Sequence, residues 1–155
     1  MTELSEKVNE NIILIPCSGS EYHGELARQA AIRLSDKSKI SSITTMTCST
    51  IFLKNVLLGK EKLVEISKNH LNNSYIIIIN GCNSSCASEI YRFLEIEPDL
   101  VISVQDIIPK PHLNLNDLNT FKMLPKISDV KNEDINLVIQ HILDELQKKG
   151  FNISD

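Results

Sequence analysis

The sequence predicts an α/β fold: a single Rossmann-like three-layer domain with a four-stranded, mainly parallel sheet in the order 2-1-3-4. Two observations support this prediction. Continuous apolar runs, typical of strands buried on both faces, alternate along the chain with stretches of helical periodicity. Turn residues follow each apolar run before the next helix, which favours parallel strands with right-handed crossovers and helices on both faces.

Four segments are expected to form the strands. Residues 12–15, Ile-Ile-Leu-Ile, form the first and stop at Pro16. Residues 42–47 are a weaker candidate, rich in the β-branched residues Ile and Thr. Residues 75–79, a Tyr followed by four Ile, are the strongest candidate, and residues 100–104 form the fourth.

The helices are expected between these strands and after the last one. Apolar residues at helical spacing mark residues 27–34, then 50–70 with a break near Gly59, then 87–94, and finally 132–149. The last stretch closes with two lysines before a glycine, a pattern typical of a helix C-terminus.

The chain of 155 residues is expected to be one domain, with no repeats and no second unit. Residues 1–10 are interpreted as a polar N-terminal segment. Residues 106–130 contain three prolines and little periodicity, so they are interpreted as an irregular loop or lid. Because this segment follows the fourth strand, it begins at the carboxyl edge of the sheet and could cover that edge.

Composition narrows the classes of function and the compartment. A net charge of −4, an aromatic content of 5% and the absence of Trp argue against a nucleic-acid binder. No secretory signal is visible in the polar N-terminus, and the run 75–79 is too short to span a bilayer. A cytoplasmic protein without membrane contact is therefore expected, with cysteines that are free, metal-bound or catalytic.

The four cysteines of the chain, Cys17, Cys48, Cys82 and Cys86, all lie at turns just past predicted strands. In a parallel sheet these turns share one edge, and ligands bind there, at the switch point between strands 1 and 3. Single cysteines are often small buried apolar residues. Four at one sheet edge instead predict a shared site.

This set of thiols suits a metal ion. Cys82 and Cys86 are four residues apart at a helix start, so they would share one face if both were helical. A helix N-terminus also favours thiolates by lowering the pKa of cysteine. Cys17 and Cys48 would complete the tetrahedral all-sulfur shell that zinc prefers. The metal ion is the only partner that the sequence indicates.

Two other uses of the same cysteines stay open. One is a [4Fe–4S] cluster, and the other is a thiol-based redox or sulfur-transfer enzyme with Cys82 as nucleophile. His23 is interpreted as a surface residue, or else as a substitute ligand or proton carrier, and His112 on the possible lid is a minor candidate. Whether the protein is an enzyme is left open.

Three elements carry a resemblance to a known family. They are Ile-Pro-Cys-Ser-Gly-Ser at 15–20, Cys48 after the second strand, and Asn-Gly-Cys-Asn-Ser-Ser-Cys-Ala at 80–87. Together they resemble the DGC domain family, which is described as zinc-binding and named after an Asp-Gly-Cys tripeptide. The resemblance covers about residues 12–106 and implies that all four cysteines are metal ligands. It implies no reaction. Asn80 stands where the family has its Asp, and Asn83 where it often has Pro.

Overall fold

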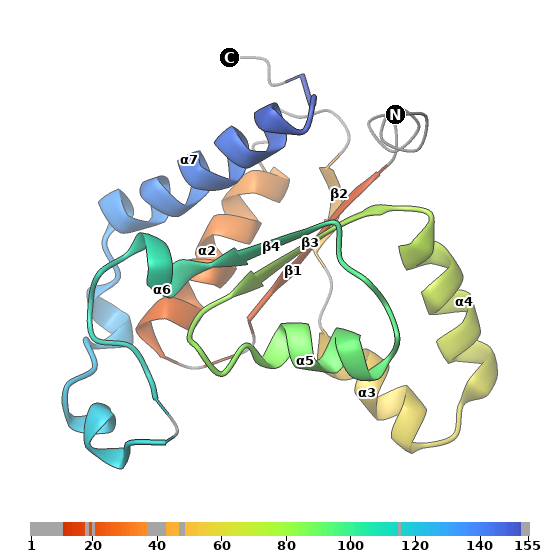
Figure 1. Ribbon diagram of the computed structural model, residues 1–155, viewed down its shortest axis with the longest axis horizontal. Coiled ribbons are helices and arrows are strands. Elements are labelled where there is room, and N and C mark those ends of the chain that lie inside the picture. Colours follow the sequence, from red (N-terminus) through yellow and green to blue (C-terminus); the bar gives the residue numbers. More distant parts are fainter. Residues whose placement is uncertain are drawn as a thin grey trace.

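The computed structural model describes residues 11–17, 19, 21–36, 43–46, 49–114 and 116–152, without the side chains of 43–46 and 49–52. In chain order the elements are β1 (Ile12–Pro16), α2 (Tyr22–Asp36), β2 (Ile43–Met46), α3 (Ser49–Leu57), α4 (Glu61–Asn72), β3 (Tyr75–Asn80), α5 (Cys86–Phe93), β4 (Leu100–Ser103), α6 (Val104–Ile107), the 3-10 turns η1 (Leu118–Lys122) and η2 (Ile127–Asp129), and α7 (Asn132–Lys148). Strands and helices alternate from β1 to α6, so the chain has an α/β fold (Figure 1).

The expected four-stranded, mainly parallel sheet needs correction. A purely parallel three-stranded sheet of β1, β3 and β4 forms the core, with six α-helices in the described part of the chain. β2 lies beside β1 at the edge of the sheet, in the order β2-β1-β3-β4. It is only four residues long, and its pairing with β1 shifts in register between Ile12 and Ile13. Among the residues whose side chains are described, the strand residues of the core come from β1, β3 and β4.

The central strands separate two hydrophobic clusters. Alternate residues of β1 point to opposite faces, so Ile12 and Leu14 join one cluster while Ile13 and Ile15 join the other. The first cluster contains buried residues of α2 and α7, and the second contains residues of α4 and α5. Figure 1 shows these helices on the two sides of the sheet. Burying each such aliphatic side chain contributes about 1.5–3 kcal/mol.

The helix expected over residues 50–70 is two helices. α3 and α4 are separated by a turn in which Gly59 has φ +64°, a left-handed conformation that glycine adopts without strain. The expected break near Gly59 is therefore confirmed.

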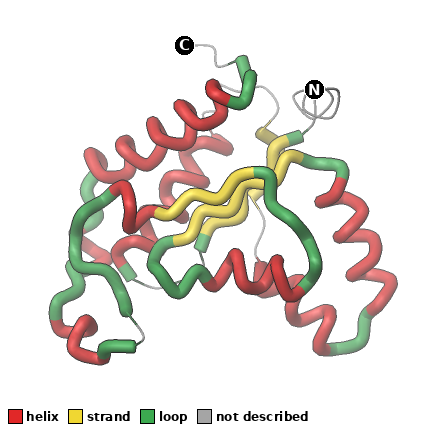
Figure 2. Tube along the Cα trace, viewed as in Figure 1, coloured by secondary structure: helices red, strands yellow, loops and turns green. Residues whose placement is uncertain are grey.

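The segment after β4 contains more regular structure than its composition indicated. β4 ends at Ser103, one residue earlier than expected, because α6 begins at Val104. The 3-10 turns η1 and η2 follow within long loops before α7 (Figure 2). Residues 112–114 are not in a strand.

Among the described residues, no helix combines the length and apolar character needed to cross a bilayer.

Candidate metal site at the carboxyl edge of the sheet

Cys17 continues directly from the end of β1. Its backbone N–H donates to the carbonyl of Ile79 at 2.8 Å, so the parallel ladder between β1 and β3 extends to the cysteine itself. The thiol is buried and accepts a hydrogen bond from the backbone N–H of Gly19 at 3.3 Å. Ser18 and Ser20, which flank Gly19, lie outside the described residues. The first predicted ligand is therefore held at the carboxyl end of β1.

Cys82 follows β3, the neighbouring strand, and is also buried. The preceding residue, Gly81, packs against the start of α2. A Cβ atom at Gly81 would lie 2.7 Å from the backbone nitrogen of Gly24 and 2.9 Å from Oε1 of Glu21, which is closer than real contacts allow. Only glycine fits here, and this close approach brings the Cys82 turn against the loop that leads from Cys17 into α2.

Cys86 is the first residue of α5 and is exposed. Cys82 precedes the helix, so the expectation that both cysteines share one helix face is wrong. The turn between them is closed by a hydrogen bond from the backbone N–H of Ser85 to the carbonyl of Cys82 at 3.1 Å. Ser85 itself has φ 49°, a conformation that is uncommon for residues other than glycine. A turn, and not a helix, therefore connects the buried Cys82 to the exposed Cys86.

Asn80 connects the end of β3 to the first turn of α5. Its side chain is buried, its Nδ2 donates to Oγ of Ser88 at 2.7 Å, and its Oδ1 accepts from the backbone N–H of Ser88 at 3.4 Å. The sequence alone identified Asn80 only as the loss of a carboxylate. In the structure, Asn80 stabilises the start of the helix that carries Cys86. The feature of the sequence that could have indicated this role is a polar residue at the end of a strongly apolar strand.

The electrostatic environment of Cys86 connects three thiols. Although Cys86 is exposed, partial desolvation of its thiol raises the pKa of Cys86. Negative charge on Cys17, Cys82 and Glu89 raises this pKa further, while a hydrogen bond with the backbone of Cys86 acts in the opposite direction. The lower pKa expected from a helix N-terminus is therefore not found for Cys86. Cys17 and Cys82 follow neighbouring parallel strands, and the Ser85–Cys82 hydrogen bond keeps Cys86 close to Cys82, so the three cysteines lie at one edge of the sheet.

The fourth predicted ligand cannot be placed in the same way. Cys48 lies outside the described residues. Within the described part of the chain, no three His, Cys, Asp or Glu side chains already stand in positions that would hold a metal ion. The structure thus brings three thiols to one edge of the sheet without arranging them as a ligand shell.

Two polar residues at the start of α2, Glu21 and His23, were not recognised as partners from the sequence. The Glu21 carboxylate is buried and accepts hydrogen bonds from the backbone N–H groups of His23 and Gly24. Burial raises the pKa of Glu21, but the neighbouring His23 side chain and these two N–H groups outweigh that effect and lower it. His23 is fully buried, so its interpretation as a surface residue is wrong.

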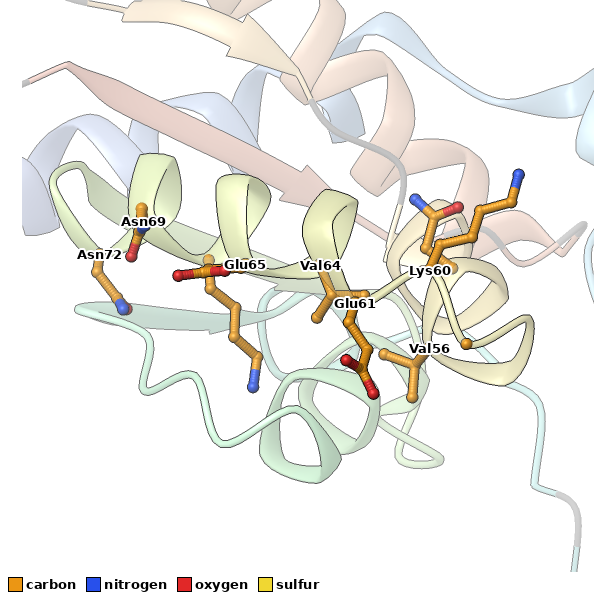
Figure 3. A pocket seen from close by; sticks show the side chains of 10 residues that line it. Val56, Lys60, Glu61, Val64, Glu65, Asn69 and Asn72 are labelled. Atoms are coloured by element: carbon orange, nitrogen blue, oxygen red, sulfur yellow. The ribbon is translucent and has the colours of Figure 1, made fainter.

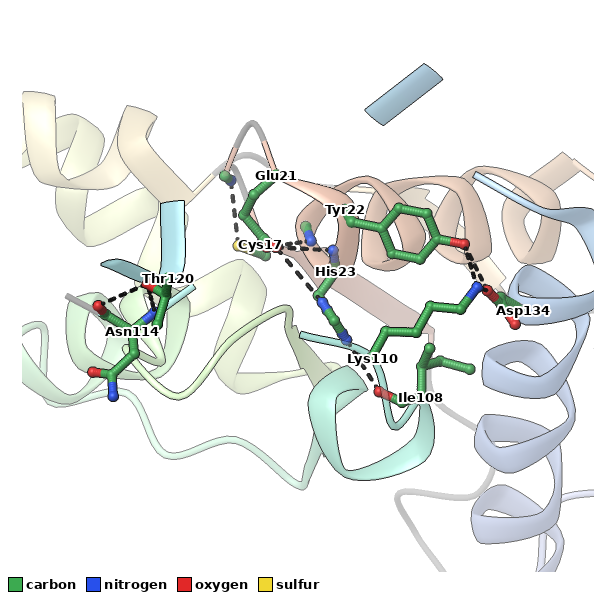
Figure 4. Close-up of polar contacts among 11 residues, drawn as sticks. Cys17, Glu21, Tyr22, His23, Ile108, Lys110, Asn114, Thr120 and Asp134 are labelled. Atoms are coloured by element: carbon green, nitrogen blue, oxygen red, sulfur yellow. Dashed lines mark hydrogen bonds and ion pairs between the residues drawn. The ribbon is translucent and has the colours of Figure 1, made fainter. Parts of the chain in front are cut away.

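His23 also contacts the segment that follows β4. Its Nε2 lies 3.1 Å from the carbonyl oxygen of Ile108, and its ring meets the ring of His112 edge-on, with 5.9 Å between centroids. Figure 4 shows His23 between Glu21 and Ile108, with Cys17 on the other side of Glu21. The part of the predicted lid from Ile108 to His112 is thus attached to the helix start beside the cysteines.

A groove elsewhere on the surface is unrelated to the thiols. It lies between α3 and α4, has a volume of about 600 Å³, and is lined by residues that include Val56, Lys60, Glu65 and Asn69 (Figure 3). None of its lining residues is a cysteine or histidine. The candidate site is therefore the carboxyl edge of the sheet and not this groove.

Comparison with known proteins identifies one family. The family model of the DGC domain matches residues 13–142, which is most of the chain and includes all four cysteines. The resemblance found from the cysteine motifs is thereby confirmed. Searches of curated proteins and of solved structures gave no match.

Proposed function

This chain belongs to the DGC domain family, and on that premise we propose that it binds a zinc ion through Cys17, Cys82 and Cys86, with Cys48 as the fourth ligand. An all-sulfur donor set suits zinc, which is commonly bound by four cysteines in structural sites. When bound, the ion would neutralise the thiolates and connect the turns after β1 and β3.

The observation that carries the proposal is the placement of three thiols after two neighbouring parallel strands: Cys17 follows β1, and Cys82 and Cys86 flank the turn after β3. Thiolates at Cys17 and Cys82 raise the pKa of Cys86, so a fully ionised set is disfavoured without a cation. A divalent ion reverses this repulsion, because metal-bound thiols lose their protons. The thiols are not yet in a ligand arrangement, so binding requires their turns to close.

The donor set also indicates the type of role. Four thiolates would leave no open coordination position, which favours a structural or metal-handling role over hydrolysis. Cys17 and Cys82 are buried, whereas Cys86 is exposed. Cys86 is therefore the described ligand that an incoming thiol could reach first.

Elemental analysis of anaerobically purified protein tests the proposal, with thiols counted before and after chelation. The expected result is one zinc ion per chain and four thiols that become reactive only after chelation. Substitution of each cysteine by Ser should lower zinc content in every variant. Metal-free protein with four freely reactive thiols, which takes up no added zinc, contradicts the proposal.

The same preparation separates the alternatives. A brown protein containing iron and sulfide would identify a [4Fe–4S] cluster on the same cysteines. A metal-free protein in which one Cys→Ser substitution abolishes thiol reactivity would identify a thiol enzyme. The burial of Cys82 and the raised pKa of Cys86 both argue against that second alternative.

A further inference from the structure

The buried carboxylate of Glu21 lies beside both of the turns that carry the buried thiols of Cys17 and Cys82. Glu21 directly precedes the first residue of α2, and only 7% of its surface is exposed. Acidic side chains are seldom buried unless polar groups compensate for the lost water. Two backbone N–H groups of α2 do so here, but they do not explain why two further segments of backbone pack around the same carboxylate.

The chain after Cys17 packs against both this carboxylate and the start of α2. A Cβ atom built on Gly19 would lie 3.2 Å from the Cys17 sulfur and 3.9 Å from Oε1 of Glu21, and Figure 4 draws Cys17 next to the Glu21 side chain. The carbonyl oxygen of Gly19 would lie 2.5 Å from a Cβ atom at Gly24. The same oxygen accepts a hydrogen bond from Nη1 of Arg28 at 3.1 Å. The turn after β1 is therefore held against the first turns of α2.

The turn after β3 approaches the same carboxylate oxygen. A Cβ atom built on Gly81 would lie 2.9 Å from Oε1 of Glu21, so only the absence of a side chain allows this approach. That oxygen is held in place because it accepts the backbone N–H of Gly24. Cys82 is the next residue after Gly81 and is buried. One carboxylate oxygen thus lies beside both cysteine-bearing turns.

Capping of α2 does not explain why this residue is a glutamate. Position 21 is the N-cap of the helix, because its carbonyl oxygen accepts from the N–H of Glu25 at 2.8 Å and its side chain accepts from His23 and Gly24. The side chains preferred at an N-cap are the shorter ones of Ser, Thr, Asp and Asn. Glutamate has one methylene group more than aspartate, and its carboxylate reaches the backbone of Gly81.

We propose that Glu21 is the positioning residue of the metal site, an inference that rests on the proposed zinc function. Its carboxylate acts through the two turns and not as a ligand: it sets how the turn after β1 lies against the turn after β3. Because α2 holds the carboxylate in place, both turns pack on a fixed group. Cys17 and Cys82 then need less rearrangement to reach one ion, which strengthens binding.

Cobalt binding tests this role, because Co²⁺ replaces zinc in thiolate sites and its thiolate complexes absorb visible light. Glu21→Asp shortens the side chain and keeps its charge. The matched control is Tyr22→Phe, which removes the bond from the Tyr22 hydroxyl to Asp134 at the start of the same helix. We expect Glu21→Asp to weaken cobalt binding about tenfold or more, the effect typical of residues that orient metal ligands. Tyr22→Phe should leave the affinity nearly unchanged.

Urea denaturation of the metal-free variants separates positioning from capping. Glu21→Asp should unfold at nearly the same urea concentration as the wild type, because aspartate is a preferred N-cap. Tyr22→Phe should unfold at a lower concentration, because it leaves the partly buried Asp134 without one of its donors. Equal cobalt affinity in the wild type and Glu21→Asp would overturn the proposal. A loss of affinity that only follows the loss of stability across the variants would do the same.

Alkylation of the reduced, metal-free protein distinguishes failure of this role from failure of the zinc proposal. The buried thiols of Cys17 and Cys82 should react with iodoacetamide severalfold faster in Glu21→Asp, because the turns that bury them lose a common contact. Unchanged rates for both thiols would contradict the positioning role. A wild type that binds neither cobalt nor zinc would contradict the zinc proposal, and the alkylation rates would still decide whether Glu21 aligns the turns.

Discussion

The starts of α2 and α5 lie at the same edge of the sheet but are stabilised in different ways. α2 is capped locally, because the Glu21 side chain accepts from the N–H groups two and three residues further on. α5 has no such local cap, and its third residue, Ser88, bonds instead to Asn80 at the end of β3. Stabilisation of the α5 start therefore depends on the end of β3, and the first residue of α5, Cys86, is exposed.

Gly81→Ala should have the largest effect, because Gly81, in the connection between β3 and α5, packs closely against the start of α2. A methyl group there meets the Gly24 backbone and the Glu21 carboxylate, neither of which can move freely. We expect a loss of about 3 kcal/mol or more in the free energy of unfolding, measured by urea denaturation. Gly59→Asn is the control, since that site has open space and a φ that Asn tolerates. Similar stabilities for both variants would contradict the close packing.

Glu21→Gln should remove the charge from the α2 cap and cost about 2 kcal/mol near neutral pH. The pKa of Glu21 is lowered in the folded protein, so its contribution is present above the ordinary carboxyl pKa and is lost as pH falls through the folded value. The stability difference between wild type and variant should therefore shrink on acidification.

Urea denaturation at several pH values measures this difference. Glu25→Gln, on the same helix but in a partly exposed pair with Arg28, is the matched control and should cost less than about 1 kcal/mol. A pH-independent difference for Glu21→Gln would show that the carboxylate is not responsible.

Asn80→Ala should cost about 1 kcal/mol, the usual effect of losing a helix cap, together with the bond to the Ser88 hydroxyl. Asn80→Asp should be nearly neutral, because a carboxylate can accept from both the N–H and the hydroxyl of Ser88 at a helix start. Thermal denaturation of the two variants compares them. If Asp destabilises as strongly as Ala, the remote cap is not the role of this position.

The smallest effect is expected for the reactivity of Cys86 in the reduced, metal-free protein. Cys82→Ser removes one of the groups whose negative charge raises the pKa of Cys86, so alkylation of Cys86 at alkaline pH should become a fewfold faster. The pH dependence of labelling by iodoacetamide, followed by mass spectrometry, measures the change. Ser85→Ala serves as a control, since it leaves the thiols in place. An unchanged alkylation rate of Cys86 in Cys82→Ser would show that Cys82 does not influence the pKa of Cys86.

Local sequence patterns were sufficient to predict two of the strands, the break near Gly59 and the positions of two cysteines. The runs at Ile12–Pro16 and Tyr75–Asn80 could be recognised as strands because buried strands need continuous apolar, β-branched residues. The break at Gly59 and the positions of Cys17 and Cys82 after their strands could be recognised in the same way. β2 was harder to predict, because a short edge strand has a weak apolar signal, and its pairing is irregular.

The sequence by itself determined the α/β alternation, the family motifs and the placement of thiols after strands, because these depend on neighbours along the chain. Only the tertiary structure decided which thiols are buried, how Asn80 holds α5, and that His23 meets Glu21 and Ile108 inside the protein. His23 and Ile108 are 85 positions apart. No local periodicity encodes such a contact, because it arises only when β4 delivers its following segment to the edge where α2 begins.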